Sequence, residues 1–450
     1  MPATHALHTD LYQLTMLASY FHRGMHTTPA VCEMFVRRLP KNRRFLVVAG
    51  LEQALDMLQG LRFTDAQIEA LKEVPGLSDA LSYEFLEYLR GFRFKGNVYA
   101  VPEGTVLFEN EPMVRVEADL ASAQLVETFL LSAINHQTNI ATKAARVVLA
   151  AGERAVLEFG TRRTHPDAAV DVARAAYIAG FAGSSNVEAA ARYGVPARGT
   201  MAHMYVMASD DEEQAFAAYS SLYKNSTYLI DTYDTLRGLE RAVRVVGDNL
   251  KAVRIDSGDL ADMSKKARAK LKELGRDDVQ IVLSSDLDEY ALEGLNGNGD
   301  YDAAGVGTRL ATCDDAPSLG GVYKLVQIGE RLVAKFSESK VTYPGAHQVY
   351  RHEKDGVFAF DHLGMVGEKS FPFIDSEELL ICVMQEGKRL HHEGIHDMRA
   401  RCRAQIAKLP PELKEIGSRT DERVHLYEVR PSEALNAALE QCRAAVEPLE

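Results

Sequence analysis

Short runs of the β type alternate with longer alanine-rich helical stretches through the middle of the chain. The runs are rich in β-branched and aliphatic side chains, and they are Ala155–Phe159, Met204–Met207, Thr227–Ile230, Ala252–Ile255, Gln280–Leu283 and Ala303–Val306. The stretches between them, such as Leu260–Leu274, have the composition of helices. Strands that alternate with helices are typical of βα units, in which successive strands lie parallel in one sheet. The pattern therefore predicts an α/β fold for this part of the chain.

The two ends of the chain show a different pattern. The first 120 residues mix helical stretches with strand-like runs and short turns such as Pro102–Gly104, which indicates an α+β domain. After about residue 333 strand-like runs return, and the helical stretches Ile395–Leu409 and Pro431–Ala445 follow them. We therefore predict an N-terminal α+β domain over residues 1–120, an α/β barrel catalytic domain over 121–340 and a C-terminal segment over 341–450.

The composition is that of an ordinary folded protein without a strong positive charge. The chain has 450 residues, of which 46% are hydrophobic and 26% charged, and its formal net charge is −13. This charge argues against an overall basic surface for nucleic acid. No run of about 18 apolar residues is present, so we predict no membrane span. The five cysteines include no C-x-x-C pair and the N-terminus lacks a signal-peptide pattern, so we expect a cytoplasmic protein.

Polar residues follow most of the predicted strands at their carboxyl ends. These groups are Gly160–Arg163, Asp231, Asp256–Asp259, Ser284–Asp286 and Gly307–Thr308. In the run at 204–207 the polar residue, His203, instead precedes the apolar stretch. Because the loops after parallel strands converge at one mouth of an α/β barrel, we expect these groups to form one site. Any one of them alone is more typical of an ordinary turn, and their recurrence after successive strands is what favours a functional site.

The residue types in these groups suit a phosphorylated or carboxylated substrate. Arg162 and Arg163 can each hold two oxygens of an anion, although exposed arginines more often pair with acidic neighbours. Asp256 and Asp286 follow successive strands, where carboxylates can hold Mg²⁺ or accept hydrogen bonds from ribose hydroxyls. The stretch Asp256–Asp259 is also a suitable N-cap for the helix predicted after it.

Two glycines and one histidine are weaker signals. Gly305 and Gly307 would let backbone N–H groups approach a phosphate, but neither G-x-G-x-x-G nor G-x-x-x-x-G-K-[ST] is completed. A lone histidine such as His203, beside apolar residues, is more often structural than catalytic. The motifs of zinc proteases, serine hydrolases and protein kinases are absent from the sequence, which argues against these classes.

Several motifs, in their order along the chain, closely resemble those of the nicotinate phosphoribosyltransferase family. They are Thr9–Met16, Glu158–Arg163, Gly183–Val187, Gly199–His203, Arg254–Asp259 and Gly305–Thr308. The resemblance implies the type II phosphoribosyltransferase fold, an irregular α/β barrel with an N-terminal α+β domain completed by C-terminal chain, and a homodimer with shared active sites. The implied reaction, in NAD biosynthesis and salvage, converts nicotinate and phosphoribosyl pyrophosphate to nicotinate mononucleotide and pyrophosphate, with Mg²⁺ and coupled ATP hydrolysis.

The resemblance also implies roles for particular residues in substrate binding. Phe159 of one subunit and Tyr12 of the other would sandwich the pyridine ring, since flat aromatic faces bind a flat ligand well. Arg254 would contact the base or its neighbouring phosphates, and Asp231 would support the mouth of the site. The residues that would contact phosphates are Arg37, Arg162, Gly305 and Gly307.

Four further residues carry the implied chemistry and the choice of base. Asp256 and Asp286 would hold ribose hydroxyls or the metal, and His203 matches the histidine that this family phosphorylates from ATP. Where Ser185 stands, nicotinamide phosphoribosyltransferase carries an aspartate, which accepts a hydrogen bond from a carboxamide and repels a carboxylate. Serine can instead donate to an anion. The expected substrate is therefore nicotinate.

Three alternatives draw on the same residues. Nicotinamide phosphoribosyltransferase matches the same motifs and differs at Ser185. A glycosidase could use paired carboxylates in an acid-lined barrel, but Arg162, Arg163 and Arg254 argue against a neutral sugar. A non-catalytic interaction scaffold would show no saturable turnover of phosphoribosyl pyrophosphate. The last two alternatives do not explain the order of the motifs.

Overall fold

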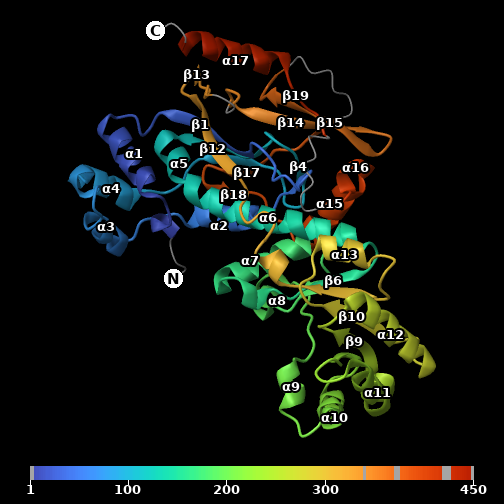
Figure 1. The fold of residues 1–450 in the computed structure, drawn as a ribbon. Helices are drawn as coiled ribbons and strands as arrows, with labels where there is room; N and C mark the ends of the chain where they lie inside the picture. The colour runs from blue at the N-terminus through green and yellow to red at the C-terminus, as the bar shows by residue number, and fades with distance from the viewer. Residues whose placement is uncertain (1–4, 338–340, 369–375, 418–426, 447–450) are drawn as a thin grey trace. The chain divides into compact units, whose positions relative to one another are not determined.

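The computed structural model describes residues 5–337, 341–368, 376–417 and 427–446 (Figure 1). The chain forms two compact units. The first contains Met1–Asn139, Ser318–Leu413 and Glu422–Glu450, and the second contains Ile140–Pro317 and Lys414–Asp421. N-terminal and C-terminal chain thus share one unit, as the type II phosphoribosyltransferase fold implies. No helix among the described residues is both long enough and apolar enough to cross a membrane.

The first unit is an α+β structure built on antiparallel strands. Its largest sheet has seven strands in the order β13-β12-β1-β5-β3-β17-β18, and a second sheet has the order β16-β14-β15-β19. The strands of the large sheet are β1 (Pro29–Val36), β3 (Asn97–Ala100), β5 (Pro112–Asp119), β12 (Gly321–Ile328), β13 (Arg331–Leu332), β17 (Ile381–Gln385) and β18 (Lys388–Arg389). Those of the second sheet are β14 (His347–Lys354), β15 (Val357–Met365), β16 (Ser376–Glu378) and β19 (Val429–Pro431). A short ladder joins β2 (Leu46–Val47) to β4 (Val106–Leu107).

Helices complete this first unit and bury its core. They are α1 (Leu11–His22), α2 (Leu51–Gly60), α3 (Asp65–Lys72), α4 (Tyr83–Gly91), α5 (Leu120–Leu125), α15 (Ile395–Ala407), α16 (Pro411–Lys414) and α17 (Glu433–Val446). Strand and helix side chains share one apolar cluster, in which Met34, Val98 and Val116 of the sheet and Leu17 and Leu55 of the helices are fully buried. Helix α6 (Glu127–Ala151) begins in this unit and ends in the second.

The second unit is built on an open parallel sheet of six strands, which curls as half of a barrel. Its strand order is β7-β6-β11-β10-β9-β8, and all neighbouring strands pair in parallel. The strands are β6 (Ala155–Glu158), β7 (Gly183–Ser184), β8 (Ser226–Leu229), β9 (Leu250–Ile255), β10 (Gln280–Ser284) and β11 (Ala303–Val306). The predicted strands at 155–159, 227–230, 252–255, 280–283 and 303–306 are confirmed. Short runs made up mainly of apolar residues are typical of strands in a parallel sheet.

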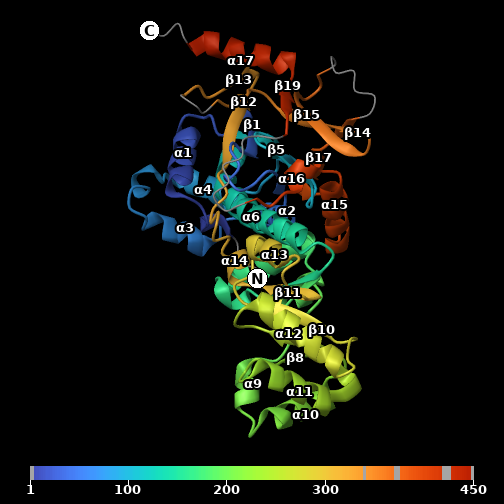
Figure 2. The same cartoon turned by 45° about the vertical axis from the view of Figure 1, so that its right-hand side comes forward.

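Helices lie between the strands of the second unit in chain order. They are α7 (Pro166–Ile178), α8 (Val187–Tyr193), α9 (His203–Met207), α10 (Glu212–Leu222), α11 (Thr235–Val246), α12 (Leu260–Glu273), α13 (Glu289–Leu295) and α14 (Thr308–Ala311). Helix α11 packs against β9, and α12 packs against β9 and β10. Figure 2 shows α12 beside β10. Within the stretch predicted to cap α12, the N-cap residue is Asp259. Its side chain accepts a hydrogen bond from the backbone N–H of Asp262 at 3.1 Å.

Among the described residues of the second unit, one predicted strand is wrong and one observed strand was not predicted. Residues 204–207 belong to helix α9, in which Val206 is buried while Met204 and Met207 are 73% and 65% exposed. The run is apolar, yet it forms a short helix and not a buried strand. Periodicity alone cannot distinguish a helix from a strand in so short a run. Strand β7, Gly183–Ser184, takes the edge position beside β6. With two small residues it lacks the apolar pattern that reveals a strand.

Candidate active site

The carboxyl ends of the parallel strands surround a pocket of about 360 Å³ in the second unit. Because all six strands run in one direction, the residues that follow them meet at the same edge of the sheet. The pocket is lined by Phe159, Arg162, Arg163, Ser185, Gly199, Thr200, Met201, Ala202, His203, Arg254, Asp256, Ser284, Ser285, Asp286, Gly305, Gly307 and Thr308. Four of the five predicted groups thus line one pocket, and Asp231 is the exception. The volume is sufficient for a small-molecule ligand.

One wall of the pocket depends on the absence of a side chain at Gly305. The backbone N–H of Phe159 donates to the carbonyl of Val306 at 2.8 Å, which holds the end of β6 against β11. A Cβ atom at Gly305 would lie 2.5 Å from Cε2 of Phe159, far closer than side-chain atoms approach. The Phe159 ring therefore lies over the bare backbone of Gly305. Gly160 and Gly307 also approach closely, because a Cβ on Gly160 would lie 2.9 Å from the Gly307 carbonyl oxygen.

A buried carboxylate, Glu158, joins the ends of β6 and β7. Its Oε2 accepts a hydrogen bond from the Ser184 hydroxyl at 2.5 Å, and its Oε1 accepts one from the backbone N–H of Gly160. Burial raises the pKa of Glu158, and these two hydrogen bonds counteract part of that rise. The neighbouring residues Phe159 and Ser185 are thereby held on adjacent strand ends. Glu158 is not among the predicted site residues, because a carboxylate at the end of an apolar run gives no sign in the sequence of being buried.

A second polar network supports Asp256. The carboxylate of Asp231 accepts hydrogen bonds at Oδ2 from the backbone N–H of Asp256 at 2.8 Å and from the Ser257 hydroxyl at 2.6 Å. The Ser284 hydroxyl donates to Oδ1 of Asp256. Oδ1 of Asp231 is buried and has no hydrogen-bond partner among the described residues. Asp231 is not among the residues that line the pocket, and it binds the backbone of Asp256, which does line it.

His203 is the first residue of α9 and lies beside Asp256. Its Nδ1 is 3.1 Å from the Thr232 hydroxyl, and its Nε2 is 3.9 Å from Oδ2 of Asp256. The side chain is 40% exposed. The hydrogen bond at Nδ1 leaves Nε2 as the ring nitrogen nearer to the carboxylate. The histidine is therefore anchored at one nitrogen and accessible from the pocket.

Arg254 places a guanidinium group in the wall of the pocket. One of its terminal nitrogens, Nη1, donates to the Thr200 hydroxyl at 2.5 Å, and its Nε has no partner in the described part of the chain. Burial lowers the pKa of Arg254, while the carboxylates of Asp256 and Asp231 act in the opposite direction. Arg162 lies exposed in the short 3-10 helix after β6. Guanidinium groups with unfilled donors suit an anionic ligand.

Comparison with known proteins identifies the family. The family model of the nicotinate phosphoribosyltransferase (NAPRTase) N-terminal domain matches residues 7–135. The model of the nicotinate phosphoribosyltransferase (NAPRTase) family matches residues 155–333. The chain belongs to the nicotinate phosphoribosyltransferase family.

Individual relatives agree with this placement in the family. The chain is 43% identical over 449 residues to nicotinate phosphoribosyltransferase pncB2 of Mycobacterium tuberculosis, covering 98% of this chain and 94% of that protein. It is 47% identical over 360 residues to nicotinate phosphoribosyltransferase of Bacillus subtilis, covering 77% of this chain and 73% of that protein. The crystal structure of human nicotinic acid phosphoribosyltransferase matches with a TM-score of 0.83 at 27% identity, covering 96% of this chain and 99% of that one. The expected type II phosphoribosyltransferase fold is thus confirmed.

Two residues that the family resemblance assigns to the active site, Tyr12 and Arg37, belong to the first unit. Tyr12 belongs to α1, and its side chain is 47% exposed. Arg37 directly follows β1, and its Nη2 donates to the Thr342 hydroxyl at 3.4 Å. The Nε of Arg37 is buried without a hydrogen-bond partner among the residues described. Contact of Tyr12 and Arg37 with the substrate stays a prediction.

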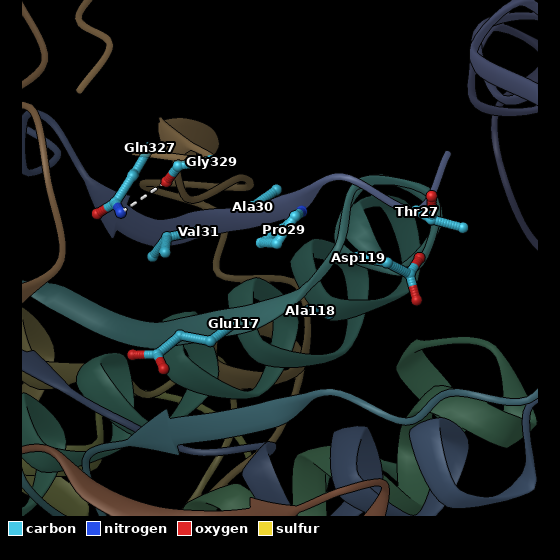
Figure 3. Close-up of a pocket in the computed structure, with 9 residues that line it drawn as sticks. All are labelled: Thr27, Pro29, Ala30, Val31, Glu117, Ala118, Asp119, Gln327 and Gly329. Atoms are coloured by element: carbon cyan, nitrogen blue, oxygen red, sulfur yellow. Dashed lines mark hydrogen bonds between the residues drawn. The ribbon is translucent and has the colours of Figure 1, made fainter. Parts of the chain in front are cut away.

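A second cavity, of about 380 Å³, lies in the first unit between β1, β5 and the end of β12 (Figure 3). Its carboxylates are already engaged. Glu117 accepts from Nε of Arg115 at 2.8 Å, and Asp119 caps α5 by accepting from the backbone N–H of Ser122 at 2.8 Å. Figure 3 also shows the Gln327 side chain donating to the carbonyl of Gly329, at 3.0 Å. The pocket at the parallel strand ends is therefore the candidate active site of this nicotinate phosphoribosyltransferase family member.

Proposed function

We propose that this chain transfers the phosphoribosyl group from phosphoribosyl pyrophosphate to nicotinate, with coupled ATP hydrolysis. The observation that carries the proposal is the composition of the pocket, where guanidinium and hydroxyl donors lie beside the two carboxylates Asp256 and Asp286. Donors suit the anionic base and the phosphates, and carboxylates suit the sugar and a metal ion. The relatives are named for this transfer. Its product, nicotinate mononucleotide, belongs to NAD biosynthesis.

The pocket side chains can lower the barrier of this reaction by electrostatics and by positioning. The bond from the ribose carbon to the pyrophosphate oxygen breaks, and the pyridine nitrogen forms a new bond to that carbon. Asp256 and Asp286 would stabilise the positive charge that develops on the sugar. Phe159 and Ser185 would fix the base in position for attack. No general base is needed, because the pyridine nitrogen already has a free lone pair.

Mg²⁺ is part of this proposal. Within the described residues no cluster of three or more His, Cys, Asp or Glu side chains could hold a metal ion. Mg²⁺ does not need one, since it commonly binds through one or two carboxylates together with substrate phosphates and water. Asp256 and Asp286 both line the pocket and fit that requirement. When bound, the ion would stabilise the negative charge on the departing pyrophosphate.

We also propose a homodimer in which the two subunits share their active sites. Tyr12 of one subunit would cover the face of the base opposite Phe159 of the other. The exposure of the Tyr12 ring on α1 supports this role, because the ring is accessible for contact with a second chain. Arg37 would contact phosphates of the substrate. The proposal places the protein in the cytoplasm, where phosphoribosyl pyrophosphate and ATP are available.

Substrate choice tests the proposed function directly. Wild-type protein should convert nicotinate far better than nicotinamide or quinolinate when the three bases are offered in parallel product assays. Ser185 lines the pocket, and Ser185→Asp would place a negative charge beside the carboxylate of nicotinate. We expect this variant to reduce the preference for nicotinate over nicotinamide by at least about tenfold, because like charges repel at short range.

Ser185→Asn is the matched control for Ser185→Asp, since asparagine has nearly the same shape without the charge. A smaller change in Ser185→Asn than in Ser185→Asp would assign the effect to charge. Equal use of nicotinate and nicotinamide by the wild-type protein would contradict the proposed substrate. Preference for nicotinamide would instead favour the alternative, nicotinamide phosphoribosyltransferase.

His203→Ala is expected to remove the stimulation by ATP while leaving a residual transfer that does not depend on ATP. Phosphoryl transfer from ATP to a ring nitrogen of His203 would release ADP and leave a phosphohistidine beside Asp256. The position of His203 in the pocket wall, with Nδ1 held by Thr232, supports this role. The residual activity is expected because Asp256 and Phe159 remain in place.

The experiment combines labelled ATP with mass spectrometry of acid-labile phosphate. His392→Ala removes an exposed histidine from the first unit and is the control variant. It should retain both the phosphoenzyme and the ATP stimulation. Phosphate on another histidine, or full ATP stimulation of His203→Ala, would leave His203 with a structural role only.

A further inference from the structure

The turn that carries Asp286 has an unfavourable backbone conformation. Ser285 has a φ of 104° and Asp286 a φ of 44°, in the left-handed region that glycine adopts far more readily than other residues. Both side chains are exposed and both line the pocket. A turn of this kind persists only where its surroundings hold it in place. The position of the Asp286 carboxylate therefore depends on whatever holds the turn.

Arg309 contacts the backbone of this turn. Its Nε donates to the backbone carbonyl of Asp286 at 3.0 Å. Arg309 belongs to α14, which directly follows Gly307 at the end of β11. Strands β10 and β11 are neighbours in the sheet, so this hydrogen bond joins the loops that follow two adjacent strands. Arg309 is not among the residues that line the pocket.

The guanidinium group of Arg309 also pairs with two carboxylates. Its Nη1 lies 3.0 Å from Oδ2 of Asp314 and 3.6 Å from Oδ2 of Asp288. Asp314 also faces the fully buried Lys143, whose Nζ is 3.7 Å away and forms a 2.8 Å ion pair with Asp315. An isolated surface ion pair contributes little to stability, whereas this network connects the arginine to a buried cation. Arg309 thus has a defined position from which to hold the turn.

We propose that Arg309 is a positioning residue that keeps the Ser285–Asp286 turn in its strained conformation, and with it the Asp286 carboxylate in the pocket. The inference rests on the proposed function, in which Asp286 serves the ribose or the metal. Loss of Arg309 would release the turn to conformations that serine and aspartate prefer. The phosphoribosyl half of the reaction should then suffer, while the base-binding wall of Phe159 and Ser185 keeps its own supports.

The test is the effect of Arg309→Gln on the two substrates separately. We expect the KM for phosphoribosyl pyrophosphate to rise about tenfold, the usual order for the loss of a charge-assisted hydrogen bond. The KM for nicotinate should change by less than about twofold, because among the described residues no hydrogen bond or ion pair joins the Arg309 side chain to Phe159 or Ser185. Arg309→Lys should behave like Arg309→Gln, since an ammonium group cannot reproduce the hydrogen bond and the ion pair together.

Arg268 offers a matched control at the other edge of the same strands. Its Nη1 donates to the carbonyl of Val279 at 2.9 Å and its Nη2 pairs with Asp302 at 2.6 Å. Arg268→Gln therefore removes contacts of the same kind, next to the amino ends of β10 and β11. Both variants should lower the melting temperature. Only Arg309→Gln should raise the KM for phosphoribosyl pyrophosphate.

A second substitution separates a positioning role from a merely structural one. Ser285→Gly, added to Arg309→Gln, should recover at least half of the lost affinity for phosphoribosyl pyrophosphate, because glycine adopts positive φ without steric cost. If Arg309→Gln does not fold, Asp314→Asn keeps the arginine, removes its nearest anchor and should show the same separation of the two KM values.

Three results would overturn the inference. They are equal changes in both KM values, an equal effect of Arg268→Gln, and no recovery by Ser285→Gly. A wild-type protein that makes no nicotinate mononucleotide would contradict the proposed function instead. Normal wild-type turnover together with an unchanged Arg309→Gln variant would contradict only the role of Arg309.

Discussion

Asp256→Asn is expected to lower kcat/KM by roughly 10²- to 10³-fold, the cost of removing a preorganised electrostatic group at a developing charge. The substitution keeps the shape of the side chain and its ability to accept the hydrogen bond from Ser284. It removes the negative charge that faces the sugar and the metal in the proposed reaction. The loss should appear mainly in kcat, because the charge on the sugar develops on the way to the transition state.

Steady-state kinetics with both substrates varied will measure this loss. Asp262→Asn is the control, because Asp262 is an exposed aspartate on α12 that pairs with Lys266 at 2.6 Å. The control should change kcat/KM by less than about twofold. If Asp256→Asn keeps wild-type kcat, Asp256 has no part in stabilising the transition state and the proposed mechanism fails.

Gly305→Ala is expected to reduce activity by about tenfold to a hundredfold, the range for forcing an extra methyl group into a packed site. The new Cβ would lie 2.5 Å from the Phe159 ring, so the ring must leave its position. Because Phe159 forms the predicted stacking face for the base, the KM for nicotinate should rise more than that for phosphoribosyl pyrophosphate. The added methyl group would also keep a 5′-phosphate from approaching the backbone at residue 305 closely.

The control for Gly305→Ala is Gly294→Ala. Gly294 lies in α13, and a Cβ there would meet no atom within 4 Å. Alanine is also the better helix former, so Gly294→Ala should retain full activity with equal or higher thermal stability. Kinetics and melting curves of the two variants will separate the effect of the clash from that of an added methyl group. An unchanged KM for nicotinate in Gly305→Ala would contradict the stacking role of Phe159.

Much of the second unit could be predicted from short-range patterns. Strands β10 and β11 are almost continuous apolar runs because a parallel sheet buries both of their faces. Asp256 and Asp286 could be expected at one edge, because polar residues after parallel strands share that edge. The same reasoning failed for residues 204–207, where an apolar run of four residues forms part of the mostly exposed helix α9. Run length and composition alone do not tell these two cases apart.

The supports of the site could not be predicted, because each one joins residues that are distant in sequence. The Ser284 hydroxyl reaches Asp256 across two neighbouring strands, and the Ser184 hydroxyl reaches Glu158 in the same way. Such contacts depend on strand order and register, which no local pattern encodes. The role of Arg309 is a further example, since it follows from the left-handed backbone at Asp286 and from the position of Asp314.

The sequence by itself determined the class of fold, the strand ends that carry the chemistry and, through its ordered motifs, the family. These properties depend on side-chain type and spacing, which are local. Only the tertiary structure decided which polar groups are buried, which hydrogen bonds connect the strand ends and where the backbone is strained. These properties depend on which segments meet in space. Ser285 and Asp286 show the difference, because their residue types suggest an exposed turn, and only the fold reveals that Arg309 and Asp314 connect it to the buried Lys143.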